Sequence, residues 1–165
     1  MNRGGGYKRM SIAGMEEIII IQMGGTIDKD YPRTKGGYDF EIGEPAAKNI
    51  LNRIRPTRSI ISSTHSICRK DSQDITDHER VLLANKIEEG SEKRVIVTHG
   101  TDTLLDTARF LASHLKMAAV TDVTVILTGA FTPEKFKDSD ADFNLGVAIG
   151  AVQSVTPGIW VAMNG

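Results

Sequence analysis

Hydrophobic and polar positions along the chain follow two alternating patterns. Short apolar runs of strand length recur, and between most of them lie segments whose apolar residues repeat at helical spacing. The runs cover residues 17–23, 59–63, 95–97, 123–127 and 158–163, and the helical segments cover 44–54, 76–89, 101–116 and 142–155. Strands that alternate with helices predict an α/β fold with parallel strands and right-handed crossovers.

The predicted helices carry start signals and one unusual interior. Pro45 suits the first turn of the first helix. Thr76 and Glu79 have the form of a capping box at the start of the second. Gly146 and Gly150 weaken the last helix intrinsically, so we expect them to allow close packing on the sheet.

The stretch from Asp28 to Gly43 is polar and long for a connection in a compact domain, as lids often are. Tyr38, Phe40 and Ile42 alternate, which predicts a short hairpin at its end. Tyr38 is then either the aromatic anchor of this hairpin or a group that acts on a ligand when the lid closes.

Composition excludes several functional classes. The chain has 165 residues and a formal net charge of −1, which permits a full core but gives no basic footprint for a nucleic acid or an anionic membrane. A single cysteine, Cys68, excludes a disulfide framework and a cysteine-rich zinc site. No apolar run approaches the ~20 residues of a membrane span. We expect no metal and no cofactor.

The first residues differ in composition from the rest. Gly4-Gly5-Gly6 and scattered basic residues occur there without an apolar stretch, unlike a secretory signal. We expect residues 1–15 to be a disordered leader, with Met10 or Met15 as alternative starts, and residues 16–165 to form one domain. The absence of a signal predicts a cytoplasmic protein.

Two predicted strands end in turns rich in glycine and hydroxyl groups. Residues 24–26 read Gly-Gly-Thr, and residues 99–102 read His-Gly-Thr-Asp. Ligands bind at the carboxyl ends of parallel strands, where glycine lets the backbone approach a ligand closely. Thr101 or Asp102 can equally be the N-cap of the following helix, and the turn alone leaves both interpretations open.

With several further segments, the two turns resemble the bacterial-type L-asparaginase family. The other segments are Thr34-Lys35-Gly36-Gly37-Tyr38, Asp71-Ser72-Gln73-Asp74, Thr128-Gly129-Ala130 and Asp142-Phe143-Asn144-Leu145, in the order the family shows. The likeness runs from about Glu17 to the C-terminus. It implies a three-layer α/β/α domain with a mainly parallel, flavodoxin- or Rossmann-like sheet. It also implies hydrolysis of the side-chain amide of L-asparagine to L-aspartate and ammonia.

The resemblance also implies roles for single residues. Thr26 and Thr101 are the two candidate nucleophiles, and Tyr38 on the lid orients Thr26 when the loop closes. The substrate-binding residues that it implies are Ser72 and Gln73 for the α-carboxylate and amino group, Asp102 for the α-ammonium, and Gly25 and Gly100 in the turns.

A threonine hydroxyl needs a base, and general-base catalysis is worth about 10²–10⁴-fold. In the family this base is a lysine that follows the strand matching Gly158 to Met163. A second domain of the family also completes the site of a neighbouring subunit. Neither the lysine nor the second domain has a counterpart in this sequence. Lys29, Lys135 or Lys137 could substitute, although each has the pattern of a solvated surface charge, as does the charged loop 129–141. We expect a homodimer or a larger homo-oligomer.

Two other functions stay open. The chain is alternatively a non-catalytic amino-acid-binding module or a truncated asparaginase-like domain. A third interpretation is the amidohydrolase component of a tRNA-dependent amidotransferase, which the lack of a basic patch disfavours. The choice between asparagine and glutamine stays open too, because one methylene is worth only about 1–3 kcal/mol in a pocket.

Overall fold

The computed structural model describes residues 17–55 and 61–165, and the leader expected over residues 1–15 lies outside them. A sheet of five parallel strands runs through the molecule in the order β4-β1-β5-β6-β7. The strands are β1 (Ile18–Gly24), β4 (Ile61–Lys70), β5 (Arg94–Thr98), β6 (Thr124–Thr128) and β7 (Gly158–Val161). This is the order of flavodoxin-like sheets, in which the chain builds outward from its first strand in both directions.

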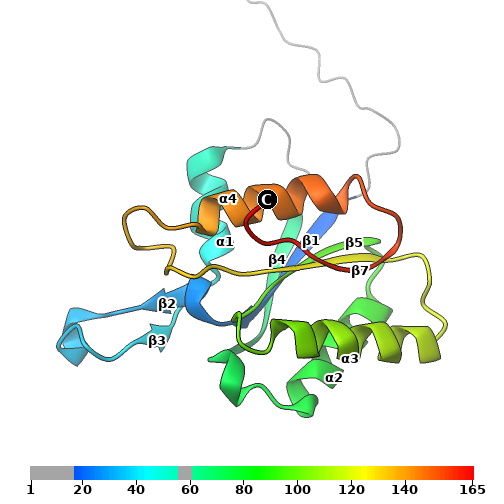
Figure 1. Ribbon diagram of the computed structural model, residues 1–165, viewed down its shortest axis with the longest axis horizontal. Helices are drawn as coiled ribbons and strands as arrows, with labels where there is room; N and C mark the ends of the chain where they lie inside the picture. Colours follow the sequence, from blue (N-terminus) through cyan, green and yellow to red (C-terminus); the bar gives the residue numbers. More distant parts are fainter. Residues whose placement is uncertain (1–16, 56–60) are drawn as a thin grey trace, which may run out of the picture.

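Helices cover both faces of the sheet, which confirms the predicted three-layer α/β/α architecture (Figure 1). One face carries α1 (Ala46–Ile54) and α4 (Ala141–Val152), and the other carries α2 (Asp77–Glu89) and α3 (Leu104–Met117). Short 3-10 turns, η1 to η3, cover Thr26–Asp28, Arg33–Lys35 and Ser72–Asp74.

The position of a strand in the sheet explains its sequence pattern. β1 lies between two strands and under helices on both sides, so every residue in it is buried. Ile18 and Ile20 pack toward α1 and α4, while Ile19 and Ile21 pack toward α2 and α3. β4 lies at the edge of the sheet, where polar residues are tolerated. The apolar run predicted a strand that ends at residue 63, but β4 continues to Lys70 through polar residues.

Three expectations about helices are wrong. The helix expected from Thr101 begins at Leu104, with Thr103 as N-cap, so neither Thr101 nor Asp102 caps it. Gly146 and Gly150 are not points of close packing, because a Cβ at either position would meet nothing within 4 Å. Pro45 is the N-cap of α1 rather than part of its first turn.

The capping box at the start of α2 is confirmed. Thr76 accepts a hydrogen bond from His78 N, and the Glu79 side chain accepts one from Thr76 N at 2.8 Å. Lys70 Nζ lies 2.7 Å from Glu79 Oε1, and these bonds lower the pKa of Glu79 to about 2. The start of α2 is thus fixed directly after the Ser72–Gln73 segment.

The expected hairpin is present. β2 (Lys29–Asp30) and β3 (Glu41–Ile42) pair antiparallel and project from the body of the molecule (Figure 1). Its aromatic anchor is Tyr31, whose ring centroid lies 6.3 Å from that of Phe40 and 5.4 Å from that of Phe136. Tyr38 is 91% exposed, so the interpretation of Tyr38 as the anchor is wrong.

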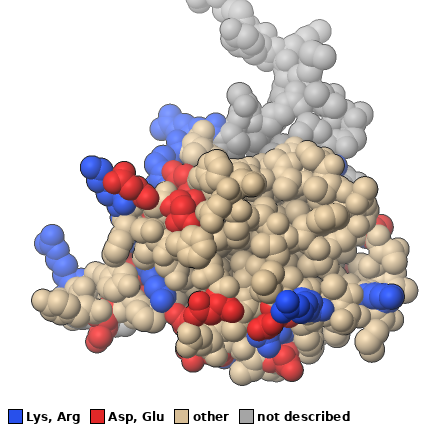
Figure 2. Space-filling model, in the orientation of Figure 1, with Lys and Arg blue, Asp and Glu red and all other residues tan. Residues whose placement is uncertain are grey.

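Charges of both signs are mixed on the face that Figure 2 shows, as the net charge of −1 leads one to expect. The loop 129–141 is not solvated throughout, because Glu134 is buried and accepts a 2.8 Å ion-pair bond from Arg53 Nη1. In the two described ranges, each helix is too short or too polar to cross a bilayer.

Candidate active site

The carboxyl ends of β4, β1 and β5 lie next to one another, and each leads into a segment with predicted site residues. Gly24 pairs with Lys70, and Gln22 pairs with Thr98. The segments are η3 after β4, η1 after β1 and the turn 99–103 after β5. From β1 the chain goes to β4 on one side, and from β4 it crosses back to form β5 on the other side of β1. This edge is therefore the switch point where open α/β sheets bind ligands. The expected adjacency of the two threonine turns is confirmed.

The turns after β1 and β5 touch through their glycines. A Cβ on Gly25, which has φ +88°, would lie 2.2 Å from Gly100 Cα. A Cβ on Gly100 would lie 2.7 Å from Ser72 Oγ. Neither position has room for a side chain, and Gly25 also needs a left-handed backbone. Glycine here lets the three loops that carry Thr26, Ser72 and Thr101 meet at one place.

The residues predicted to hold the head group of a substrate are joined to each other. Gln73 Nε2 donates a 2.7 Å hydrogen bond to Asp102 Oδ2, and both residues are exposed. Ser72 is buried, and its backbone oxygen accepts a 2.7 Å hydrogen bond from Thr103 Oγ1. The segments after β4 and β5 are therefore locked together, with an exposed carboxylate and amide at the junction.

A buried polar chain supports the turn 99–103 from below. His99 is fully buried; its Nδ1 lies 2.8 Å from Gly100 O, and its Nε2 lies 2.9 Å from Thr107 Oγ1. Because a carbonyl only accepts, Nδ1 carries the proton, and Thr107 donates to Nε2 while it accepts from Arg80 Nε at 3.1 Å. Burial lowers the pKa of His99, which keeps the ring neutral in this arrangement.

The turn after β1 is tied to the segment after β4 by an ion pair. Lys29 Nζ lies 2.9 Å from Asp71 Oδ2 and 4.0 Å from the centroid of the Phe40 ring. The Lys29 side chain is only 16% exposed, so its interpretation as a solvated charge is wrong. Lys135 pairs with Asp30, but half of its side chain is exposed, and Lys137 is exposed as well, so both keep the solvent exposure that was expected.

The structure brings together most, but not all, of the predicted site residues. Thr26 and Thr101 are half-buried on adjacent turns. Tyr38 lies on the projecting hairpin with its side chain in solvent, so its action on Thr26 stays a prediction. Sequence reasoning gave no role to His99, although it stands inside the turn 99–102, because nothing local shows that its partner is Thr107. Over the described ranges, no group of three or more His, Cys, Asp or Glu side chains is placed to hold a metal ion.

The fold and the site define a flavodoxin-like α/β domain with a polar site at its switch point. The sequence model described as "Asparaginase, N-terminal" matches residues 17–165, and the chain belongs to this family. L-asparaginase 2 of Escherichia coli (strain K12) is 30% identical over 166 residues, which cover 96% of this chain and 46% of the relative.

Solved structures agree with this assignment. The thermostable L-asparaginase from Thermococcus kodakarensis superposes with a TM-score of 0.71 at 26% identity, over 89% of this chain and 44% of that one. A probable cytoplasmic L-asparaginase from Campylobacter jejuni gives 0.70 at 27% identity, over 90% and 44%. The chain thus spans less than half the length of these relatives.

A partial match comes from the amidotransferase class. A glutamyl-tRNA(Gln) amidotransferase protein of Methanobrevibacter smithii is 37% identical over 83 residues, which cover 50% of this chain and 18% of that protein.

Proposed function

We propose that this chain acts as an L-asparaginase, hydrolysing the side-chain amide of L-asparagine to L-aspartate and ammonia. The observation that carries the proposal is the meeting of the Thr26 turn, the Ser72–Gln73 segment and the Thr101–Asp102 turn at one edge of the sheet. These residues supply two hydroxyl groups for the reacting end of asparagine and a carboxylate with an amide for its head group.

Each residue has a role in the proposed reaction. The Asp102 carboxylate binds the α-ammonium group, and Ser72 and Gln73 hydrogen-bond the head group. The hydroxyl of Thr26 attacks the amide carbon while Thr101 assists, and the reverse assignment is the alternative. The amide nitrogen takes up the proton that the threonine hydroxyl loses and leaves as ammonia, and water then hydrolyses the threonine ester to aspartate. Tyr38 orients Thr26 when the hairpin closes.

The proposed reaction also needs a base that accepts the proton of the threonine hydroxyl. Lys29 and Lys135 are held in ion pairs with Asp71 and Asp30, which makes both poor candidates. We infer that a second copy of the chain completes the site, so that the active form is a homodimer or a larger homo-oligomer. Light scattering at increasing protein concentration tests this inference, and a monomer at the concentrations where activity is measured would contradict it.

The name of the Campylobacter jejuni neighbour supports a cytoplasmic location for this chain.

The deciding experiment is ammonia release from L-asparagine by the full chain and by the Thr26→Ala and Thr101→Ala variants. We expect turnover by the parent chain and a loss of about 10²-fold or more in each variant. Absence of turnover by the parent chain would sink the proposal.

A second candidate is an amino-acid-binding module without catalysis. The ion pairs of Lys29 and Lys135 favour it, because they withhold two candidate bases from the threonines. Calorimetry with L-aspartate would then show saturable binding in a chain that releases no ammonia.

A further inference from the structure

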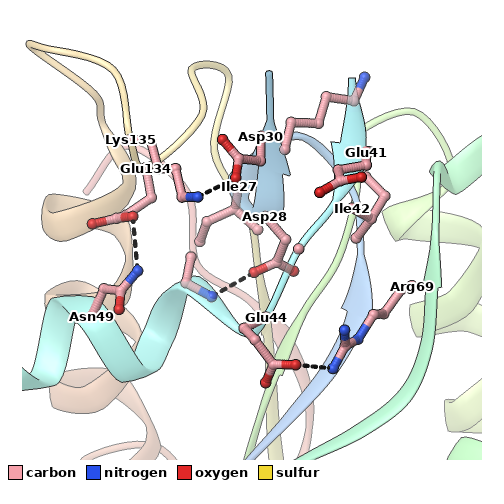
Figure 3. A pocket seen from close by; sticks show the side chains of 13 residues that line it. Ile27, Asp28, Asp30, Glu41, Ile42, Glu44, Asn49, Arg69, Glu134 and Lys135 are labelled. Atoms are coloured by element: carbon pink, nitrogen blue, oxygen red, sulfur yellow. Dashed lines mark hydrogen bonds and ion pairs between the residues drawn. The ribbon is translucent and has the colours of Figure 1, made fainter. Parts of the chain in front are cut away.

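A cavity of about 440 Å³ lies beside the β2–β3 hairpin (Figure 3). Its walls come from the hairpin strands, the amino end of α1, Arg69 of β4 and the loop residues Glu134 and Lys135. None of the threonines or head-group residues of the candidate active site lines it. The cavity is therefore a separate place on the molecule, and its volume suits a small organic ligand.

Asp28 is the polar residue of this cavity that stands out. It is only 4% exposed, and its Oδ1 accepts a 2.7 Å hydrogen bond from Ala46 N at the start of α1. Its Oδ2 has no hydrogen-bond partner among the described residues. A buried acceptor without a partner is costly, so Asp28 is suited to receive a donor from outside the chain.

The other charges of the wall show which kind of donor fits. Five acidic and three basic residues line the cavity. Asp30 pairs with Lys135 and Glu44 pairs with Arg69 inside the wall, while Lys29 is held by Asp71 outside it. The basic groups of the wall are therefore already engaged. Glu134 is also paired, with Arg53 outside the wall, so the charge that would attract a cation here is that of the buried Asp28 carboxyl group.

Burial and the neighbouring charged and polar groups shift the pKa of Asp28. Burial raises the pKa of Asp28 to about 7, with Glu134 acting in the same direction. The hydrogen bond from Ala46 N, the Gln22 side-chain amide and the Arg69 guanidinium act in the opposite direction. Lys29, Asp30, Glu41, Glu44 and Lys135 are the remaining charged groups of the wall. A bound cation next to Asp28 would hold the carboxyl group ionised at neutral pH.

We propose that this cavity binds a small organic cation that carries an ammonium or guanidinium group, with the buried Asp28 carboxylate as its counter-ion and Oδ2 as its hydrogen-bond acceptor. Oδ2 is shielded from solvent, so binding requires the carboxyl group to turn toward the cavity. An N–H donor also fits the site better than a metal ion, because the described residues offer no set of three metal ligands.

The test is an NMR titration of the ¹⁵N-labelled full chain with methylguanidinium chloride and with propylammonium chloride. We expect saturable shifts of the Gly43 and Ala46 amides, which flank Asp28 in space. Binding should be about tenfold weaker at one pH unit below the pKa of Asp28 than well above it, because the carboxyl group is then mostly protonated. Tetramethylammonium, a cation without an N–H donor, should not produce these shifts.

Two variants separate Asp28 from the general charge of the protein. Asp28→Asn keeps an acceptor for Ala46 N but removes the charge, and it should abolish saturation. Asp39→Asn removes the same charge from an exposed position outside the cavity wall and should leave the affinity within about twofold. The proposal is overturned if neither probe saturates, if the Asp28→Asn variant binds as the parent chain does, or if tetramethylammonium gives the same shifts. This readout does not depend on ammonia release, so it can fail without the proposed function failing.

Discussion

Gln73 and Asp102 are joined by a hydrogen bond of 2.7 Å between Nε2 and Oδ2, although they lie 29 residues apart in the chain. One residue follows β4 and the other follows β5, the strands on either side of β1. The bond holds an exposed carboxylate in a defined direction at the edge of the sheet where both threonine-bearing turns lie. In the proposed function, a carboxylate held in this way is already oriented when the ammonium group of a ligand arrives, which lowers the entropic cost of binding.

The Asp102→Asn substitution tests this carboxylate. We expect the dissociation constant of L-aspartate to rise about 10- to 100-fold, because a charged hydrogen bond worth about 1.5–3 kcal/mol is lost. Asp106→Asn, which removes an exposed carboxylate in the first turn of α3, is the matched control and should leave the constant unchanged. Calorimetry measures both, and equal effects of the two substitutions would contradict the assigned role.

A methyl group at Gly25 should be strongly destabilising. Gly25→Ala combines a strained φ with a Cβ 2.2 Å from Gly100 Cα, for which we expect a loss of about 3 kcal/mol or more in the free energy of unfolding. Gly146→Ala is the control, because its Cβ meets open space in a helix and should add about 0.5–1 kcal/mol. Urea denaturation of both variants shows whether the signs are opposite, as the structure requires.

Thr107 links Arg80 to His99 under the site. Thr107→Val should cost about 1–3 kcal/mol of stability, because it leaves two buried polar groups without their partner. It should also weaken L-aspartate binding, since the turn 99–103 rests on His99. Thr107→Ser keeps the hydroxyl group, so relative to Thr107→Val it should recover more of the L-aspartate affinity than of the unfolding free energy. A Ser variant that binds L-aspartate as weakly as the Val variant would contradict the role of this hydrogen-bond chain.

The ion pair between Lys29 and Asp71 should behave as a coupled pair. In a double-mutant cycle with Lys29→Met and Asp71→Asn, we expect a coupling free energy of about 1 kcal/mol near neutral pH. The Lys29 ammonium group lowers the pKa of Asp71 below 3.8, so the stabilisation is present above that pH and is lost as the pH falls through the lowered value. Additive single substitutions at neutral pH would show that the pair does not join the two loops.

Asp28 should make stability fall as the pH rises. Its pKa is about 7 in the folded chain against 3.8 for an ordinary aspartate, so folding favours the protonated form. The contribution is therefore largest at low pH and is lost as the pH rises through about 7. Between about pH 5 and pH 8 this amounts to about 3 kcal/mol of unfolding free energy, which the Asp28→Asn variant should lack. Urea denaturation of both proteins at these two pH values measures the difference, and parallel pH profiles would contradict it.

Much of the fold was predictable because it depends on local patterns. The apolar run of β1 and the helical spacing of α2 and α3 follow from which faces are buried. The strand-end positions of Thr26 and Thr101 then place both turns at one edge of any parallel sheet. The errors arose at a boundary and at single positions: β4 is a polar edge strand, and α3 starts after a turn that Thr101 and Asp102 occupy.

The sequence by itself determined the α/β class, the order of the elements and the common edge of the threonine turns, because periodicity and strand polarity are properties of short segments. Only the tertiary structure decided which polar groups pair. Lys29 with Asp71, Gln73 with Asp102 and Arg53 with Glu134 are pairs between distant segments. Their formation depends on distances between loops and on burial, which arise only when the sheet and its helices pack together, and the same packing leaves Asp28 Oδ2 without a partner among the described residues.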